Sequence, residues 1–548
     1  MKRNHVFILK KSILFINLFL LLFCSTATKA TSYWDGYSYS TKWYDPNKSV
    51  YYLQSAADLC GLSHLLQKGS YVDFTGKEVI LMTDIDLGNY EWKTLGCIEG
   101  SYYYTFKGTF NGNGNRITGM KLSSIHNGFT NTTGLFGVLM EETAVIKNLI
   151  VEGEIDVSCV SLQMAYLGGI TGLNYAHIYN CISKVDIKAN GVDGSNIYAG
   201  SLVGDNYGRI RHCQSQGNIT ISQDSKSKCR VGGVAGNCPT DGSEIGACKS
   251  KTNITVIDGM NASIGGITAI SAGRISDNLY SGTIESNDCY MAYAGGIVNT
   301  GKAENCLMLG SFGGYGRYYY TGAITPITTQ EDVINCYYSE KTPNDSGVGF
   351  AVDSYTLTSG DPLPNFNTSI WNFSKGEYPD LYFEFEEAIE MPVIERIELD
   401  KNTLTMNIGD AEKLNVSIYP PEAESSLTWT SSDENIVSIS SEGWIVAKKE
   451  GTAYVTVETT NNLSATCRVE VVNELTANED IQINDVKIEG SRGKIHITTT
   501  VPIEISIYTM SGKFVRKQYL VADVNEISVT KGIYIVKTKN KTQKVMVR

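Results

Sequence analysis

The stretch Gly168-Gly-Ile-Thr-Gly172 decides the fold, because it is one copy of a motif that recurs along the chain. The copies share a first glycine, one or two apolar residues and often a second glycine, and they begin at Gly134, Gly168, Gly200, Gly232, Gly265, Gly295 and Gly322. Successive first glycines lie 34, 32, 32, 33, 30 and 27 residues apart. A period of this length is typical of a solenoid, in which each repeat forms one coil and stacked coils bury a shared core.

A second signature follows each glycine motif by about ten residues and ends in a polar residue and a cysteine. It supplies Cys181, Cys213, Cys248, Cys306 and Cys336, with Asn278 in place of the cysteine in one copy. Equivalent residues of stacked coils lie about 4.8 Å apart, so these cysteines are expected to form an internal column. We interpret the column as small apolar core residues, with disulfides or a metal site as the alternatives. No column pairs cysteine with histidine at zinc-site spacing.

The fold that fits this pattern is an all-β, right-handed parallel β-helix. The glycines are expected at corners, where the chain needs a positive φ or a close approach of backbones. Ser55, with Asp58 at capping-box spacing, predicts a short helix that covers the first coil and buries its leucines. The runs 79–82 and 84–87 predict strands of that coil.

Several of these runs resemble the GLUG-motif β-helix family of bacterial surface and adhesin-like proteins. The resemblance rests on Gly134-Leu-Phe-Gly137, the Gly-Gly-Ile copies, Thr83-Asp-Ile-Asp-Leu87 and Gly108-Thr-Phe-Asn-Gly-Asn-Gly114, and covers roughly residues 51–385. Tyr378-Pro-Asp-Leu381 resembles the closing segment of that family. The resemblance implies display, adhesion or ligand contact, and it implies no conserved catalytic set.

Two β modules follow the repeats. Short alternating strands across 393–472 predict a β-sandwich. Trp429-Thr-Ser-Ser-Asp433, Gly443-Trp-Ile-Val-Ala447 and Gly451-Thr-Ala-Tyr-Val455 resemble the group 2 bacterial immunoglobulin-like domain, which implies a stalk or spacer and a core position for Trp429.

The last module, 473–548, is basic, with twelve Lys and Arg against eight Asp and Glu. Ile507-Tyr-Thr-Met-Ser-Gly-Lys513, Lys531-Gly-Ile-Tyr-Ile-Val-Lys537 and the terminal Lys-Val-Met-Val-Arg resemble the C-terminal sorting domain of the type IX secretion system. The resemblance implies carriage across the outer membrane of a Gram-negative bacterium, with the outer-membrane secretion machinery as a partner. An ordinary small sandwich domain is the alternative.

The first thirty residues predict a secretory signal peptide, with a basic start, an apolar run over 13–23 and small residues at 28 and 30. Cys24 leaves a lipoprotein signal as the alternative. We therefore divide the chain into a signal peptide (1–30), a capped β-helix with its closing linker (31–392), an immunoglobulin-like domain (393–472) and a sorting domain (473–548). No other apolar stretch is long enough to span a bilayer.

The net charge and the acidic residues bear on two other functions, nucleic-acid binding and catalysis. The net charge of −12 argues against nucleic acid as a partner, because phosphate binding needs a basic patch. Polysaccharide lyases and hydrolases need convergent carboxylates, and the best cluster is Asp84, Asp86 and Glu91. These residues lie in a structural run of the repeat family, and the histidines lie in no metal or nucleophile motif. We therefore expect no enzymatic activity, no metal and no cofactor.

A binding surface is the stronger hypothesis. Two residues before each first glycine stands a column with four tyrosines, made of Thr132, Tyr166, Tyr198, Arg230, Ser263, Tyr293 and Tyr320. Two runs that we expect to be loops, 102–104 and 315–320, add Tyr102, Tyr103 and Tyr104, and Tyr318, Tyr319 and Tyr320. Stacked tyrosines suit sugar rings or protein surfaces. Strict alternation places Tyr166 on the same face as Ile170, so the column faces solvent only if the glycines turn a corner between them. The alternative, which the alternation favours, is that the tyrosines pack partly into the solenoid and form no binding surface.

The sequence thus predicts a secreted or surface-displayed, adhesin-like protein that binds a glycan or a host or matrix protein. A polysaccharide lyase or hydrolase and a purely structural surface component are the alternatives. The ligand is not predicted.

Overall fold

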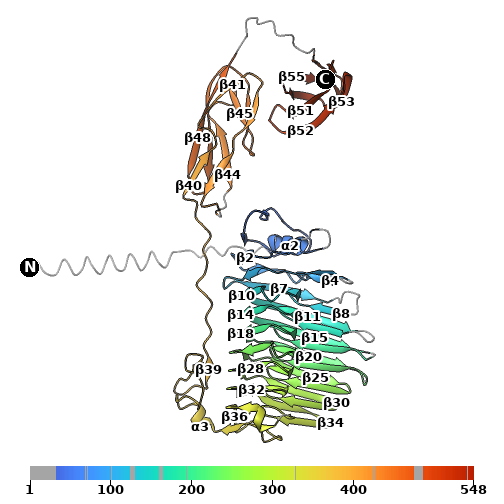
Figure 1. The fold of residues 1–548 in the computed structure, drawn as a ribbon, viewed down its shortest axis with the longest axis vertical. Coiled ribbons are helices and arrows are strands. Elements are labelled where there is room, and N and C mark those ends of the chain that lie inside the picture. The colour runs from blue at the N-terminus through green and yellow to red at the C-terminus, as the bar shows by residue number, and fades with distance from the viewer. Residues whose placement is uncertain are drawn as a thin grey trace, which may run out of the picture. The chain divides into compact units, whose positions relative to one another are not determined.

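The computed structural model in Figure 1 describes residues 33–548 except 68–69, 71, 100–101, 124–129, 160–163, 193, 328, 422, 424–425, 474–485 and 540. The expected signal peptide and Cys24 lie outside the described residues. The chain divides into two compact units between Glu390 and Met391, and each is described by itself. The described residues contain no helix that is long and apolar enough to cross a membrane.

The first unit is a parallel β-solenoid whose described strands form three sheets, called A, B and C here. The strands of sheet A are β1 Val50–Leu53, β2 Glu78–Leu81, β6 Thr109–Asn111, β10 Val145–Lys147, β14 His177–Tyr179, β18 Arg209–Arg211, β23 Glu244–Gly246, β28 Arg274–Ser276, β32 Ala303–Glu304 and β35 Val333–Ile334. The strands of sheet C are β9 Phe136–Leu139, β13 Thr171–Asn174, β17 Val203–Asn206, β22 Ala235–Cys238, β27 Thr268–Ser271 and β31 Val298–Thr300.

Sheet B is the largest sheet. Its strands are β3 Ile85–Asp86, β7 Arg116–Leu122, β8 Thr130–Thr133, β11 Ile150–Cys159, β12 Met164–Gly168, β15 Ile182–Gly191, β16 Asn196–Gly200, β19 Gln214–Ser215, β20 Asn218–Gln223, β21 Lys228–Gly232, β24 Lys249–Ser250, β25 Asn253–Asp258, β26 Asn261–Gly265, β29 Leu279–Tyr280, β30 Thr283–Gly295, β33 Leu307–Met308, β34 Ser311–Gly322, β36 Tyr337–Ser339 and β37 Phe350–Val352.

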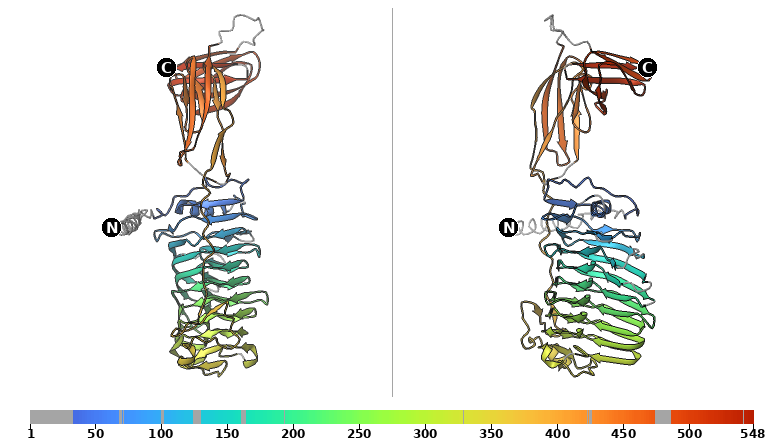
Figure 2. Two further views of the ribbon diagram at one scale, coloured as in Figure 1. Left: turned by 90° about the vertical axis from the view of Figure 1, so that its left-hand side faces the viewer. Right: turned by 45° about the vertical axis from the view of Figure 1, so that its right-hand side comes forward.

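Each coil passes from sheet A to sheet B and then turns into sheet C. In one coil the order is β14, β15, β16 and β17, and β18 begins the next coil. Ile178 pairs with Ile210 in the parallel register, so neighbouring coils are offset by one sequence repeat. The stacked coils are visible from two sides in Figure 2. The all-β parallel solenoid that the repeat predicts is confirmed.

The repeat glycines lie between sheets B and C, and their role is close approach. A Cβ on Gly200 would lie 2.3 Å from the Val203 carbonyl oxygen and 2.5 Å from the Ala235 Cα. No repeat glycine has a positive φ among those of the described chain. The repeat glycines are therefore required by the close approach of backbones and not by a positive φ.

The positive φ angles lie instead at the turn from sheet A to sheet B, at the residue before each cysteine. This position is left-handed in seven coils, with φ between 49° and 57°, at Asn148, Asn180, His212, Ala247, Asp277, Asn305 and Asn335. Asparagine and aspartate tolerate this conformation better than most residues. Side-chain amides also bond along the column, as between Asn335 Nδ2 and Asn305 Oδ1 at 3.2 Å.

A short helix covers the first coil. Helix α2, Ala56–Leu65, begins after Ser55, whose Oγ accepts a hydrogen bond from the Asp58 amide, while Asp58 accepts from the Gln54 amide. This arrangement differs from the expected capping box, because Asp58 accepts from the amide before the N-cap residue and not from that of Ser55 itself. Leu59, Leu62 and Leu66 are buried in the solenoid core, as the sequence predicts. In the same region β4, Cys97–Glu99, and β5, Tyr102–Tyr104, form a hairpin.

The other end is closed by residues that follow β37. Helix α3, Ser354–Leu357, and the paired strands β38, Trp371–Asn372, and β39, Asp380–Leu381, cover sheet B there. The short helix η1, Gln330–Asp332, precedes β35. Trp371 is fully buried against Leu279 and Leu307.

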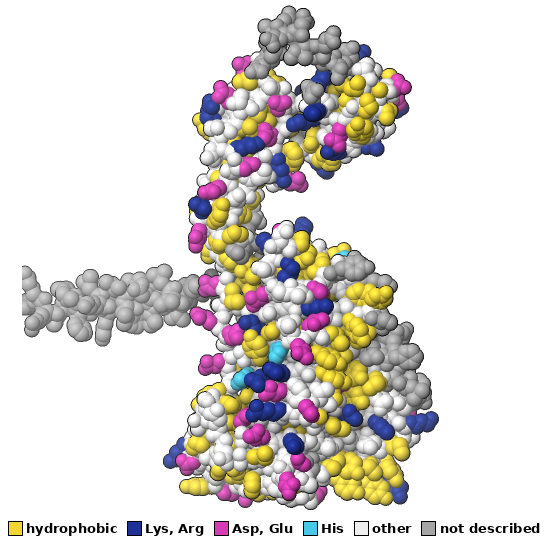
Figure 3. All heavy atoms as spheres, viewed as in Figure 1, with side chains coloured by type: hydrophobic (Ala, Val, Ile, Leu, Met, Phe, Trp, Pro, Cys, Tyr) yellow, Lys and Arg dark blue, Asp and Glu magenta, His cyan; other side chains and the backbone are white. Residues whose placement is uncertain are grey.

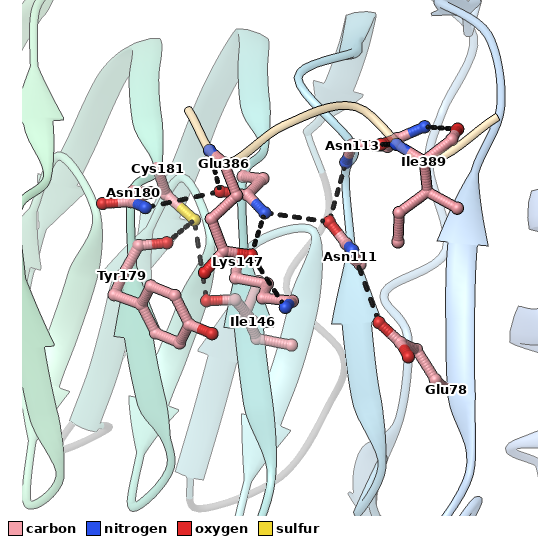
Figure 4. A network of polar contacts seen from close by, with 11 residues as sticks. Glu78, Asn111, Asn113, Ile146, Lys147, Tyr179, Asn180, Cys181, Glu386 and Ile389 are labelled. Atoms are coloured by element: carbon pink, nitrogen blue, oxygen red, sulfur yellow. Dashed lines mark hydrogen bonds and ion pairs between the residues drawn. The ribbon is translucent and has the colours of Figure 1, made fainter. Parts of the chain in front are cut away.

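After β39 the chain runs back along the solenoid, and we call residues 382–390 the strap. Glu386 forms an ion pair with Lys147 at 2.9 Å and accepts a hydrogen bond from Asn148 Nδ2 at 2.9 Å. The Ile389 amide donates to Asn113 Oδ1 at 2.6 Å. Figure 4 shows the strap crossing the asparagine column in this way. The closing linker expected before residue 393 is therefore bound to the solenoid over the strap.

The second unit contains two β modules with separate cores. The strands of the first are β40 Arg396–Leu399, β41 Thr403–Asn407, β42 Ala411–Lys413, β43 Val416–Tyr419, β44 Leu427–Ser431, β45 Val437–Ile439, β46 Trp444–Ala447, β47 Gly451–Thr459 and β48 Ser464–Val472. The strands of the second are β49 Lys487–Ser491, β50 Lys494–Thr499, β51 Ile503–Thr509, β52 Phe514–Leu520, β53 Asp523–Ser528, β54 Gly532–Thr538 and β55 Thr542–Val547. Trp429 is half-buried and packs against the first core.

Candidate binding surface

The tyrosine column of the sequence is a real column in space. Tyr166 pairs with Tyr198, Tyr198 with Arg230, and Tyr293 with Tyr320, each in direct parallel register. The column runs along the ends of the sheet B strands that precede the glycine corner. Parallel stacking therefore places these side chains one above another over successive coils.

The glycines turn the corner on which the surface hypothesis depends. Strand β12 belongs to sheet B and β13 to sheet C, and Gly169 and Ile170 lie between them. Ile170 is fully buried, whereas Tyr198, at the column position one coil further on, is half-exposed. Because the chain turns between residues 166 and 170, strand alternation does not place these two side chains on the same face. The column therefore lies outside the core.

The aromatic rings contact one another along the column. The Tyr166 and Tyr198 rings lie 5.2 Å apart between centroids, and the Arg230 guanidinium lies 5.1 Å from the centroid of Tyr198. Tyr293 and Tyr320 are stacked at 5.0 Å with 13° between their planes. These pairs form flat, partly exposed faces of the kind that can stack against a pyranose ring.

A second column lies on the outer side of sheet C, next to the first. It contains Leu173, Asp205, Asn237 and Ile270, which are paired in sequence order. Ile270 lines a depression of about 250 Å³ together with Asn196, Tyr198, Lys228, Arg230, Asn261 and Ser263. This depression, called the corner groove here, lies where the two columns meet and spans the coils of β16, β21 and β26.

Asp205 is the buried acid of this groove. It is 3% exposed and accepts a hydrogen bond from Asn237 Nδ2 at 2.9 Å. Burial raises the pKa of Asp205 to about 6, against the lowering effects of Asn237, Arg230 and Tyr207. Burial, followed by the charge of Asp205, raises the pKa of Tyr207 to about 12. Tyr207 stacks on Tyr175 at 4.5 Å, which continues the aromatic surface beyond the corner.

Tyr175, Tyr207 and Asp205 are not among the residues predicted from the sequence. Tyr175 and Tyr207 each follow an asparagine after the glycine corner, and they lie one repeat apart. That spacing is the signal by which they can be found. No such spacing marks Asp205, because only the structure shows that its carboxyl is buried.

The far end of the solenoid carries a more exposed aromatic cluster. Tyr315 is 62%, Tyr290 44% and Tyr318 40% exposed. The Arg317 guanidinium lies 5.3 Å from the centroid of Tyr290 and 5.7 Å from that of Tyr318. Hydrophobic side chains gather at this end and along the same side of the solenoid in Figure 3.

Two of the proposed contact residues are largely inaccessible. Tyr319 is half-buried and packs against the solenoid core, because strand alternation directs it opposite to Tyr318 and Tyr320. Tyr166 is only 9% exposed, because Tyr198 and the sheet C column cover it. These two tyrosines are therefore poor candidates for ligand contact.

The other proposed tyrosines are accessible. Tyr320 is 46% exposed, Tyr198 and Tyr293 are half-exposed, and Tyr102 and Tyr103 on strand β5 are 69% and 57% exposed. Tyr104 is half-exposed at the end of that strand. The structure thus brings the column together and places the 102–104 hairpin at the other end of the solenoid.

The acidic candidates for catalysis are occupied by backbone contacts. Asp84 accepts a hydrogen bond from the Arg116 amide at 2.9 Å, and Asp86 accepts from the Gly88 amide at 2.8 Å. Glu91 accepts from both the amide and the hydroxyl of Ser123. These contacts stabilise turns between neighbouring coils and do not form a carboxylate pair around a cleft.

The cysteine column lies in the core. Cys181, Cys213, Cys248, Cys306 and Cys336 are buried as free thiols, and each Sγ lies close to a backbone carbonyl of its own coil. Burial raises the pKa of the Cys213 and Cys248 thiols well above the ordinary value. Within the described part of the chain, no group of three or more His, Cys, Asp or Glu is placed to hold a metal ion.

These features define a parallel β-solenoid protein that carries a bacterial immunoglobulin-like domain. Residues 393–469 match the family described as bacterial Ig-like domain (group 2). Residues 475–547 match a family described as a domain of unknown function, DUF6383. The two matches lie in the second unit, and they do not include the solenoid.

Curated relatives match short parts of the chain. A minor capsid protein of Enterobacteria phage T3 is 38% identical over 81 residues, which cover 15% of this chain and 18% of that protein. An uncharacterized protein of Clostridium acetobutylicum is 30% identical over 142 residues, which cover 25% of this chain and 35% of that protein. The chain thus spans well under two thirds of either relative.

Solved structures give only remote likenesses. Domains 1–6 of the surface layer protein SbsC align with 33% of this chain and 31% of that chain, at 12% identity and a TM-score of 0.16. Dimeric latent PorU from Porphyromonas gingivalis aligns with 32% of this chain and 23% of that chain, at 14% identity and a TM-score of 0.12. TM-scores this low carry no functional argument.

Proposed function

We propose that this protein is a secreted or surface-displayed, adhesin-like binding protein and not an enzyme. Its solenoid binds a glycan or a host or matrix protein through the corner groove and the aromatic cluster beside it. The observation that carries the proposal is the column of Tyr198, Arg230, Ser263, Tyr293 and Tyr320, which presents partly exposed rings on three coils, with Tyr293 and Tyr320 stacked on each other. A repeating surface of this kind fits a polymer better than a small molecule.

We prefer a glycan to a protein as the ligand. The rings lie beside polar side chains that can bond sugar hydroxyls, including Asn196, Asn261 and Ser263. Protein interfaces need a larger apolar centre, whereas sugar sites combine flat aromatic faces with planar polar groups. The groove offers the second combination.

The remaining modules serve display in this proposal. The immunoglobulin-like domain is a spacer, and the module 473–548 is a type IX sorting domain that directs export across a Gram-negative outer membrane. The resemblance of the repeat to the GLUG-motif family and the signal peptide expected over residues 1–30 agree with the same surface role. Export is tested by expressing chains with and without residues 473–548 in a bacterium that has this secretion system. The proposal requires the shortened chain to remain in the periplasm, and its secretion at the normal level would overturn the sorting role.

The binding proposal is tested with the full mature chain and a panel of plant, host and bacterial polysaccharides and matrix proteins on a sizing column. Co-elution with an intact polymer or matrix protein is the expected result. Shortening of a polymer would show that the protein is an enzyme. Elution apart from every member of a broad panel would favour a structural surface component.

A further inference from the structure

A groove of about 490 Å³ lies on the outer face of sheet B, where the closing segment ends. Successive coils supply one wall, and the closing residues Tyr378, Pro379 and Asp380 supply the other. The coil wall is made by Lys249, Lys251, Leu279, Ser281, Leu309, Gly310, Ser311, Ser339, Lys341 and Thr342. The groove is separate from the tyrosine column, since the two sets of lining residues have none in common.

The groove is positively charged in a chain whose net charge is −12. Its charged lining residues are Lys249, Lys251, Lys341 and Asp380. Asp380 forms an ion pair with Lys249, whose side chain is only 13% exposed. Lys251 and Lys341 are exposed, and neither has an ion-pair partner among the described residues. Two ammonium groups therefore remain available to a ligand.

The uncharged lining suits a ring that carries hydroxyls. Tyr378 is 46% exposed at the rim, and Leu279 and Leu309 provide apolar surface beneath it. The Ser281 and Ser311 hydroxyls line the coil wall. Concave sites for small ligands combine an apolar floor with a few polar groups that set orientation, and this groove has both.

We propose that the groove binds an anionic sugar unit, a pyranose that bears a carboxylate or a sulfate. The ring lies against Tyr378, and Lys251 and Lys341 bind the anionic group. An ammonium group binds a carboxylate and a sulfate in the same way, as a point charge, so one site can recognise either anion. The inference extends the proposed glycan binding to a second site and to a charged class of sugar.

The test measures binding of the full mature chain to three fluorescent oligosaccharides of equal length, by anisotropy at low and physiological salt. The probes are an oligogalacturonate, a sulfated glycosaminoglycan fragment and an uncharged glucan. The expected result is binding of at least one anionic probe that weakens as salt rises, because the ammonium groups are exposed. The two anionic probes show whether a carboxylate or a sulfate is preferred.

Variants assign the binding to the groove. Lys251→Gln with Lys341→Gln is expected to weaken anionic binding about tenfold, and Tyr378→Ala to weaken it as well. Lys188→Gln with Lys413→Gln removes the same charge at exposed lysines outside the groove and is expected to leave binding unchanged. Equal weakening by both double variants would overturn the inference, as would full binding by Lys251→Gln with Lys341→Gln.

The outcomes separate this inference from the proposed function. If the unmodified chain binds the uncharged glucan but neither anionic probe, only the inference is overturned, and the proposed glycan binding stands. Absence of binding to every polymer would overturn both proposals.

Discussion

At the scale of single residues, the buried carboxyl of Asp205 beside the corner groove lowers the stability of the solenoid. The carboxyl is buried among tyrosines, and its pKa is raised to about 6 from an ordinary value of 3.8. A raised pKa means that the folded state holds the proton more tightly than the unfolded state. The group therefore destabilises the fold above pH 6, and this cost disappears as the pH falls toward 4.

Asp205→Asn is expected to stabilise the solenoid at pH 8 by about 3 kcal/mol at most, since the shift is about two pKa units. The advantage of the variant should shrink between pH 6 and pH 4 and be absent below pH 4. Thermal unfolding of both chains across this pH range measures it. A difference that does not change with pH would show that Asp205 is not the titrating group.

The left-handed column is the second residue-scale feature. Asn180 has a φ of 50°, and its side chain donates to Asn148. Asn180→Val is expected to lower the melting temperature, because a branched side chain costs about 1–2 kcal/mol in this conformation. Asn180→Gly keeps the backbone freedom and should cost less. Equal losses in the two variants would assign the effect to the side-chain ladder instead.

At the scale of elements, the strap connects the end of the solenoid back to its first coils. Glu386 has a lowered pKa, because Lys147 and Asn148 bond its carboxylate. A lowered pKa stabilises the bound strap above the ordinary carboxyl pKa, and the contribution is lost as the pH falls below it. The exposure of Glu386 keeps the effect small at high salt.

Glu386→Gln is expected to increase hydrogen exchange of strap amides, including that of Ile389, because the ion pair with Lys147 is removed. Glu384→Gln is the matched control, since it is an exposed acid of the same segment. Exchange that rises equally in both variants would contradict a specific role for Glu386.

The elements also show what the sequence can predict and where it fails. The period of Gly168 and its equivalents predicts the solenoid, because stacking demands the same residue in every coil. The runs that contain Tyr102 and Tyr319 are expected to be loops, and this expectation is wrong, because they form strands β5 and β34. Only the strand register shows that Tyr319 faces inward between Tyr318 and Tyr320. The basic groove and the strap escape sequence analysis, since Lys249 and Asp380 are 131 residues apart.

At the scale of the whole molecule, the solenoid and the second unit have separate cores. Deletion of residues 391–548 is therefore expected to leave the melting temperature of the solenoid unchanged, as measured by calorimetry. The strap ends before this boundary, so the deletion keeps its contacts. A lower solenoid transition in the shortened chain would show that the units stabilise each other.

The most direct test of the account measures the affinity of the full mature chain for the polymer that it retains, in a variant that combines Tyr198→Ala, Tyr293→Ala and Tyr320→Ala. Tyr454→Ala removes an exposed tyrosine of the immunoglobulin-like domain and serves as the control. The account predicts at least about tenfold weaker binding in the triple variant at an unchanged melting temperature, and no change in the control. Undiminished binding by the folded triple variant would contradict the claim that the tyrosine column is the binding surface.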